Sequence, residues 1–240
     1  MLNSWATAGR FRLGSAKWPL GQDCVLCGGR SDASLVGPCC EGLLTAVGAA
    51  CMRCGIPLPA VGTCGNCVDH PPAFDAVVSA FAYRFPVDRL VQRFKHRGDL
   101  AIGRWLAGRI VARVRREPRP DLLVAPPLHP ARLRERGFNQ SQVLAGHVGA
   151  TLGVAVACDG LRRLRATPPQ AGLDRAARRR NLREAFACDL DLADRTVAIV
   201  DDVVTTGATA ESLALALRLA GARRIAVWAV ARTPDPVPDG

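Results

Sequence analysis

The sequence contains no run of about eighteen uncharged apolar residues, the length that a helix needs to cross a bilayer. Its first 22 residues carry scattered basic side chains and lack the apolar core of a secretory signal peptide. These two absences predict a cytoplasmic protein without a membrane span. Because 49% of the 240 residues are hydrophobic, the chain has enough apolar material for a packed core, which excludes disorder along its whole length.

Lysine and aromatic residues are scarce. Among the 32 basic residues only Lys17 and Lys95 are lysines, and with 21 acidic residues the net charge is +11. Because the planar guanidinium of arginine binds phosphate well, this surplus favours anionic partners, either nucleic acid or phosphorylated small molecules. A solvated basic surface explains the charge equally well. Seven Phe, four Trp and one Tyr leave few side chains for stacking on nucleic-acid bases.

Cysteine, by contrast, is concentrated in one part of the chain, where eight of the ten cysteines lie within residues 24–67. Cys51, Cys54, Cys64 and Cys67 form two CxxC pairs with the spacing of a zinc ribbon. Each CxxC turn places two thiolates on one side of a knuckle, so two knuckles complete a tetrahedron around Zn²⁺. A disulfide framework is the alternative, but the cytoplasm is reducing. We therefore expect these four cysteines to bind structural zinc.

The first four cysteines are less regular. Cys24 and Cys27 form another CxxC pair, whereas Cys39 and Cys40 are adjacent. Since neighbouring side chains of an extended chain point in opposite directions, both can bind one metal only within a turn. The residues leave two arrangements open, a second Zn²⁺ held by these four cysteines or a mixed pairing between the two sets.

The character of the chain changes near Pro71. The glycine- and cysteine-rich start gives way to apolar runs that alternate with amphipathic patterns, and this alternation predicts an α/β fold, a parallel sheet flanked by helices. Within this part, Cys158 and Cys188 are interpreted as buried apolar residues. The expected organisation is a flexible N-terminal segment at 1–22, a zinc-ribbon module with one or two Zn²⁺ at 23–70, the α/β domain at 71–233 and a disordered tail at 234–240.

Hydrophobic periodicity places the elements of the α/β domain. Strands are expected at 76–83, 121–125, 154–158, 196–200 and 224–230, and helices at 87–95, 100–116, 139–152 and 209–219. Asn139 is the expected N-cap of its helix, because its side chain can accept hydrogen bonds from the first turn. Gly153 is expected to end the same helix.

The most informative motif is the run VAIVDDVVTTGAT at residues 197–209. A buried strand is expected to end in Asp201 and Asp202. A short loop then opens a helix, and the residues of this junction are Thr205, Thr206, Gly207, Ala208 and Thr209. Loop N–H groups, hydroxyls and the positive helix end form a cradle for a phosphate, which Gly207 lets approach closely. The two carboxylates would repel that phosphate, so we interpret them as acceptors for sugar hydroxyls near a bound Mg²⁺.

This run resembles the motif with which type I phosphoribosyltransferases bind 5-phosphoribosyl 1-pyrophosphate (PRPP). Three further segments resemble the ComF family of competence-associated, phosphoribosyltransferase-like proteins, namely PPLHPARLRERGFNQ at 126–140, FKHRGD at 94–99, and Gln170 followed by RRRN at 178–181. The cysteine-rich start is similar to the double zinc ribbon of many of these proteins. The resemblance covers about residues 24–233 and implies a type I phosphoribosyltransferase fold.

The resemblance also implies a pyrophosphate-binding loop after the first core strand, here at 128–137. Arg132, Arg134 and Arg136 alternate in this loop and would share one face of an extended chain. Arginine forks form strong charge-assisted hydrogen bonds with a diphosphate. A solvated basic turn is the alternative interpretation.

By position, residues 161–183 correspond to the lid that closes over PRPP in such enzymes and excludes water. The expected lid contacts are Gln170, Arg179 and Asn181. Lys95 is interpreted either as a phosphate contact or as a solvated residue at a helix end. The arginine run within residues 161–183 could equally bind a nucleic-acid backbone.

Taken together, the resemblance implies Mg²⁺-dependent transfer of a phosphoribosyl group from PRPP to an acceptor that no residue identifies. The alternative is a non-catalytic factor that handles single-stranded DNA during natural transformation and uses PRPP only as a ligand. Its partners would be single-stranded DNA or competence and DNA-uptake proteins. A third interpretation is a degenerate transferase whose zinc ribbon docks another protein. The chain departs from the family pattern at Cys39 and Cys40, where a regular CxxC pair is usual.

Overall fold

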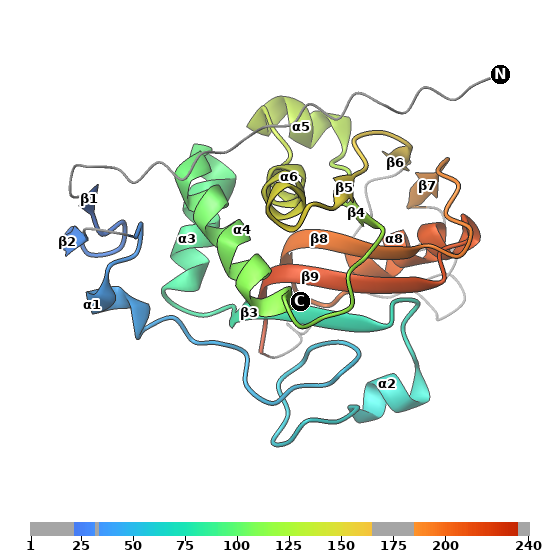
Figure 1. The fold of residues 1–240 in the computed structure, drawn as a ribbon, viewed down its shortest axis with the longest axis horizontal. Helices are drawn as coiled ribbons and strands as arrows, with labels where there is room; N and C mark the ends of the chain where they lie inside the picture. The colour runs from blue at the N-terminus through green and yellow to red at the C-terminus, as the bar shows by residue number, and fades with distance from the viewer. Residues whose placement is uncertain (1–21, 32–33, 165–184, 235–240) are drawn as a thin grey trace.

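A five-stranded parallel sheet lies at the centre of the molecule (Figure 1). The computed structural model describes residues 22–31, 34–164 and 185–234. In their order across the sheet the strands are β3 (Ala76–Ala82), β9 (Arg224–Arg232), β8 (Thr196–Val204), β4 (Leu122–Val124) and β5 (Ala155–Val156). Every neighbouring pair is parallel, so the carboxyl ends of all five strands lie at one edge.

Helices cover both faces of this sheet (Figure 1). On one face pack α3 (Val87–Arg97), α4 (Leu100–Val114) and α6 (Gln140–Leu152), and on the other packs α8 (Ala208–Leu219). The central strands are buried on both sides, which explains why β8 and β9 are almost continuously apolar. The expected class, a parallel sheet flanked by helices, is confirmed.

The ends of the helices follow local sequence signals. Asn139 accepts a hydrogen bond from the N–H of Ser141 at 3.0 Å and caps α6, as predicted. Gly153 ends the same helix with a left-handed φ of 68°, a conformation that glycine adopts without strain. Asp99 caps α4 by accepting from the N–H of Ile102. No described helix combines the length and the hydropathy needed to span a bilayer.

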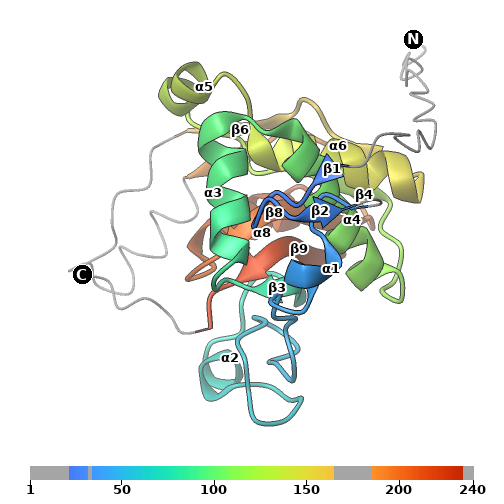
Figure 2. The same cartoon turned by 90° about the vertical axis from the view of Figure 1, so that its left-hand side faces the viewer.

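The elements described in the cysteine-rich part, at 22–31 and 34–70, are short. They are β1 (Gln22–Asp23), β2 (Arg30–Ser31), α1 (Pro38–Glu41) and α2 (Gly65–Asp69). Figure 2 shows α1 and the β1–β2 pair beside α3 and α4, and α2 on the opposite side of β3. Between them the chain touches the carboxyl end of β3, where the N–H of Ala82 donates to the carbonyl of Thr45 at 2.9 Å.

The structure differs from the sequence predictions at two places near the expected site. First, β8 continues to Val204, so Asp201 and Asp202 lie inside the strand instead of ending it. Second, the expected extended loop contains α5 (Pro130–Arg136). Local signals for this helix are present, because proline is favoured at a first helical position and Gly137 ends the helix with φ 76°.

The prediction that both isolated cysteines are buried was wrong for Cys158 and is met only in part by Cys188. Cys158 is exposed and Cys188 is only partly buried. Both lie near a small antiparallel pair formed by β6 (Leu161–Arg163) and β7 (Phe186–Cys188) at the edge of the molecule. Cys158 lies at the surface, whereas Cys188 packs against the apolar cluster between the sheet and α8.

Candidate functional site

The acidic pair lies near the carboxyl end of β8, where residues of α6 and α3 contact it. Asp201 is partly buried, and its Oδ1 accepts hydrogen bonds from the hydroxyl of Ser141 at 2.8 Å and from the N–H of Asp202 at 2.9 Å. Ser141 belongs to the first turn of α6, which Asn139 caps. The cap therefore fixes the part of α6 that holds Asp201.

Asp202 is buried, with 4% of its surface exposed. Its Oδ1 accepts from the N–H of Val203 at 2.6 Å, and its Oδ2 lies 3.0 Å from Lys95 Nζ of α3. The two charges form an ion pair by distance, but no described group donates a hydrogen bond of acceptable geometry to Oδ2. A buried carboxylate oxygen with this unused capacity is suited to a ligand hydroxyl or a cation.

The two carboxylates affect each other's protonation. Burial raises the pKa of Asp201 to about 7, and the negative charge of Asp202 acts in the same direction. The hydrogen bond from Ser141 and the charge of Lys95 oppose this rise in pKa. Burial and the neighbouring negative charge therefore favour the protonated form of Asp201.

The predicted phosphate loop follows directly. Thr205 and Thr206 are exposed, whereas Gly207, Ala208 and Thr209 are partly buried. Gly207 has φ 83°, and a Cβ built there would meet only Phe74, at 3.9 Å, so its backbone conformation and not crowding requires glycine. Because α8 begins at Ala208, its first-turn N–H groups point into this loop without partners inside the helix.

One residue of this region was missed by the sequence prediction. Arg232 ends β9 and is buried, with 4% exposed. Its Nη1 donates to the carbonyl oxygens of Val204 at 3.1 Å and of Thr205, and its Nε donates to the carbonyl of Cys54 at 3.0 Å. Burial lowers the pKa of Arg232, while the nearby cysteine thiols raise it. The sequence did offer a signal for Arg232, since it is a basic residue at the end of an apolar strand. A buried cation needs several acceptors, so such a residue is expected to hold neighbouring backbone carbonyls.

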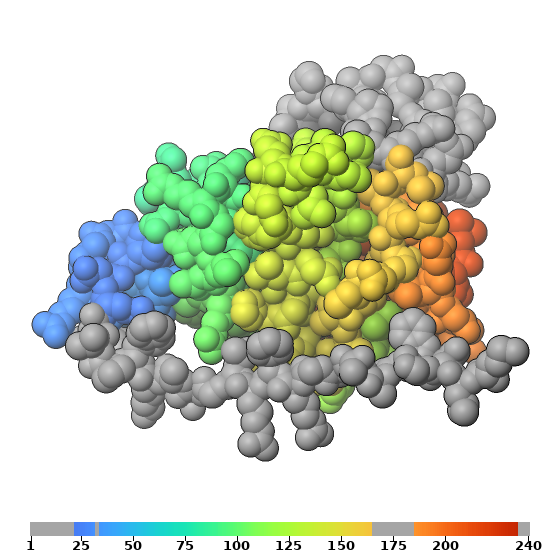
Figure 3. Space-filling view, turned by 90° about the horizontal axis from the view of Figure 1, so that it is seen from above, coloured from blue at the N-terminus to red at the C-terminus, as the bar shows by residue number. Residues whose placement is uncertain are grey.

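The three arginines expected to bind pyrophosphate lie on α5, which projects from the surface between the α3–α4 pair and β6 (Figure 3). In a helix, side chains two positions apart differ by about 200° and side chains four apart by about 40°. Arg132 and Arg136 therefore share one face of α5, whereas Arg134 lies on the opposite face, unlike in an extended loop. Arg136 donates to Gln140 Oε1 at 3.2 Å, whereas Arg132 lies near enough to Arg163 for its charge to lower the pKa of that residue further, after burial. No described contact joins these arginines to the acidic pair.

The expected lid contacts Gln170, Arg179 and Asn181 lie outside the described residues. Lys95 was predicted to bind phosphate or to be solvated at a helix end. In the structure Lys95 pairs with Asp202, and 24% of its side chain is exposed, so it is not a solvated helix end.

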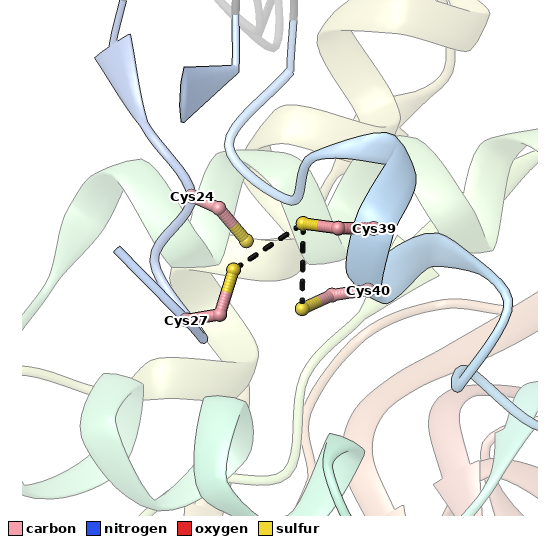
Figure 4. Close-up of side chains that lie close together, drawn as sticks. All are labelled: Cys24, Cys27, Cys39 and Cys40. Atoms are coloured by element: carbon pink, nitrogen blue, oxygen red, sulfur yellow. Dashed lines mark hydrogen bonds between the residues drawn. The ribbon is translucent and has the colours of Figure 1, made fainter. Parts of the chain in front are cut away.

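The first four cysteines converge on one point (Figure 4). The Sγ atoms of Cys24, Cys27, Cys39 and Cys40 all lie within 4.8 Å of one another. Cys39 and Cys40 belong to α1, and this helical turn directs both side chains toward the CxxC knuckle. Burial opposes ionisation of Cys24, but backbone N–H groups, led by that of Gly37, lower its pKa to about 6.

The second cluster has the same form. Cys51, Cys54, Cys64 and Cys67 also lie within 4.8 Å of one another, and Gly55 closes the first knuckle with φ 70°. Although burial again opposes it, backbone N–H groups lower the pKa of Cys51 to about 6. Among the described residues each cluster draws its ligands from one set, so the mixed pairing between the sets is not observed. Both clusters fit a tetrahedral metal, since Zn–S bonds of about 2.3 Å require sulfurs about 3.8 Å apart.

Sequence comparison identifies relatives that cover most of the chain. It is 37% identical over 191 residues to the DNA utilization protein YhgH of Salmonella typhi, with 76% of this chain and 84% of that protein covered. It is 34% identical over 192 residues to competence protein F of Haemophilus influenzae, with the same coverage. The chain belongs to the family of competence protein F and YhgH. No family model matches it.

The solved structures that resemble this chain are more distant from it than these relatives. A glutamine PRPP amidotransferase from B. subtilis complexed with ADP and GMP has a TM-score of 0.37 and 20% identity, covering 53% of this chain and 26% of that chain. A purine phosphoribosyltransferase from Pyrococcus horikoshii has a TM-score of 0.32 and 18% identity, covering 54% and 81%. Likeness at this level carries no inference about ligands, so the proposals below depend on the residues themselves.

Proposed function

We propose that this protein binds PRPP, with the 5-phosphate on the loop at 205–209 and the ribose hydroxyls on Asp201 and Asp202. The observation that carries the proposal is Oδ2 of buried Asp202, which pairs with Lys95 but accepts no hydrogen bond from a described group. It lies beside a second carboxylate and shortly before a phosphate-type loop. A phosphate alone would not need two carboxylates. A phosphorylated sugar would use both features.

Mg²⁺ fits the same residues. It is a hard cation that prefers carboxylate oxygens and usually binds through one or two of them together with substrate phosphates. Asp201 and Asp202 are the residues that would hold it, and when bound it would neutralise charge on the pyrophosphate. Lys95 Nζ lies beside Asp202 Oδ2, so this position already favours a positive charge.

The proposed activity is transfer of the phosphoribosyl group to an acceptor that remains to be identified. In such a reaction the chain's residues would act by position and charge. Asp201 and Asp202 would orient the ribose, and the loop N–H groups would hold its phosphate. The arginines of α5 would stabilise the charge that develops on the leaving pyrophosphate. The two cysteine clusters would hold structural Zn²⁺, which thiolates of this number and spacing favour.

Isothermal titration of the zinc-loaded protein with PRPP, with and without Mg²⁺, tests the proposal. Micromolar binding that requires Mg²⁺ and disappears in Asp202→Asn is the expected result. Asp189→Asn is the matched control, because its exposed carboxylate pairs with Arg162 at the molecular edge. Absence of PRPP binding by the folded wild-type protein would refute the proposal.

A second candidate function is the handling of single-stranded DNA. Two observations favour it, the names of the relatives and the exposed Arg132 and Arg134 on α5. Fluorescence anisotropy with a labelled oligothymidylate would test it, since phosphate-backbone binding weakens steeply as salt rises. Arg132→Ala with Arg134→Ala should weaken DNA binding, and Asp202→Asn should leave it unchanged. Loss of DNA binding in Asp202→Asn alone would contradict separate sites.

A further inference from the structure

The two cysteine clusters contact the α/β part through two different arginines. Arg93 of α3 donates from Nη1 to the carbonyl of Val25, inside the first CxxC knuckle, at 2.9 Å. Arg232 of β9 donates from Nε to the carbonyl of Cys54, a member of the second cluster, at 3.0 Å. In each cluster, therefore, a guanidinium donates a hydrogen bond to a backbone carbonyl of the cysteine knuckle.

The other end of Arg232 contacts the start of the phosphate loop. Its Nη1 donates to the carbonyl of Val204 at 3.1 Å, to that of Thr205, and to Thr233 Oγ1 at 2.9 Å. The N–H of Thr233 donates to the same Val204 carbonyl at 3.1 Å. One buried side chain thus links a cysteine knuckle with the backbone from which residues 205–209 begin.

This link has little freedom to adjust. Arg232 is 4% exposed, so water cannot easily replace a lost acceptor, and an uncompensated buried cation is strongly destabilising. On the cluster side, Gly55 lies so close to β3 that a Cβ there would stand 3.0 Å from Val77 Cγ1. The knuckle carbonyl of Cys54 is therefore held against the sheet while the thiols of its cluster stay together. If that knuckle opens, Arg232 loses the acceptor of its Nε, and the guanidinium that holds Val204 and Thr205 through Nη1 is no longer fixed at its other end.

We propose that Arg232 is a positioning residue that makes the order of the loop at 205–209 depend on metal in the Cys51–Cys67 cluster. The first cluster acts elsewhere, because Arg93 holds it to α3, the helix that carries Lys95. Thermodynamic coupling is reciprocal, so a phosphate ligand on the loop strengthens metal retention by the second cluster. The inference rests on the proposed function only in taking a phosphate group as the ligand of the loop.

Amide hydrogen exchange of the full zinc-loaded chain tests this without any ligand. Cys64→Ser should lower the zinc content by one atom per chain and raise the exchange rate of the loop amides at 205–209. Arg232→Met should raise the same rates while both zinc atoms remain. Arg93→Met is the matched control, an arginine with the same kind of contact to the first cluster, and it should leave the loop unchanged. The amides of central β8 report that each variant is folded.

A double-mutant cycle separates positioning from a general loss of stability. If Arg232 carries the coupling, Cys64→Ser combined with Arg232→Met exchanges no faster at the loop than the faster of the two single variants. Because Arg93→Met alone leaves the loop unchanged, its combination with Cys64→Ser should exchange at the loop like Cys64→Ser alone. Arg232→Lys, which keeps the charge but cannot reach both sides, should behave like Arg232→Met. Additive effects in the first pair, or an unchanged loop in folded Arg232→Met, would overturn the proposal.

PRPP titration adds the functional readout. In Cys64→Ser and in Arg232→Met we expect the Kd for PRPP to rise by about fivefold or more, the lower end of common coupling strengths, and not to rise in Arg93→Met. If wild-type protein does not bind PRPP, the proposed function fails, but the exchange rates still decide whether Arg232 couples the cluster to the loop.

Discussion

Lys95 Nζ lies 3.0 Å from Asp202 Oδ2, so a helix of one face of the sheet supplies the counter-charge for a buried carboxylate of the central strand. Since α3 also contacts the first cysteine cluster through Arg93, this ion pair connects three parts of the chain. A cation or sugar hydroxyl that binds Asp202 must share this oxygen with Lys95 or displace it. Lys95 is therefore the first side chain whose surroundings change on binding.

Replacing Lys95 tests its electrostatic role. In Lys95→Met we expect the pKa of Asp201 to rise above its value of about 7, because the charge of Lys95 lowers it in the wild-type protein. Carbon-13 NMR of the aspartate carboxyl groups, followed as a function of pH, measures this directly. Arg97→Met removes an exposed cation of the same helix and serves as the control. A pKa for Asp201 that is equal in both variants would contradict the assignment.

The raised pKa of Asp201 also predicts how stability depends on pH. Its usual value is 3.8 and its value in the folded chain is about 7, so between these values the folded state binds more protons than the unfolded state. The contribution of Asp201 to the free energy of unfolding therefore falls as pH rises from about 4 to about 7. Urea denaturation of wild type and Asp201→Asn across this range isolates the contribution, because the variant lacks the titrating group. If the free energy of unfolding of wild type, relative to that of Asp201→Asn, rose from about pH 4 to about pH 7, the prediction would be refuted.

Two metal ions should be present in each chain. We expect two zinc atoms by elemental analysis of the purified protein and one in Cys27→Ser, because that change removes a ligand from the first cluster. Cys188→Ser, which alters a cysteine outside both clusters, should still carry two. A single zinc in the wild-type protein, unaffected by Cys27→Ser, would show that the first cluster does not bind metal.

The phosphate loop can be tested through the conformation of its glycine. Gly207→Ala forces a Cβ into φ 83° and should lower the free energy of unfolding by about 1 to 2 kcal/mol. Under the proposed function it should also weaken PRPP binding. Gly146→Ala is a control with the opposite sign, because Gly146 is exposed inside α6 with open space around it, and alanine there should stabilise the helix by about 0.5 to 1 kcal/mol. Urea denaturation of both variants makes the comparison.

The sequence was sufficient for features that local residues determine. The alternation of apolar and amphipathic runs predicted the parallel sheet, and Asn139 was correctly identified as a helix cap. The spacing of the cysteines grouped the second cluster correctly. For the first four cysteines it left two arrangements open, and the structure shows the one in which they converge, because Cys39 and Cys40 lie in a helical turn.

Features that depend on distant segments could not be predicted in this way. Ser141 and Lys95 meet the acidic pair only because α6 and α3 pack on the same face of the sheet. Arg232 finds its acceptors in segments far from it along the chain. The error at α5 is of another kind. Local signals for a helix were present in Pro130 and Gly137, but the assumption of an extended loop took precedence over them.

The strand β3 lies at the margin of the sheet, with β9 on one side only. Strands in this position offer unpaired backbone groups to other molecules and are common starting points for aggregation. Here Thr45 and Ala46 cover the last residues of β3, through the Ala82 hydrogen bond and a bridge to Phe81. The covering segment lies between the two cysteine clusters in sequence. A chain that has lost its metal would therefore uncover this apolar margin, and chelation should make the protein prone to self-association before its central core unfolds.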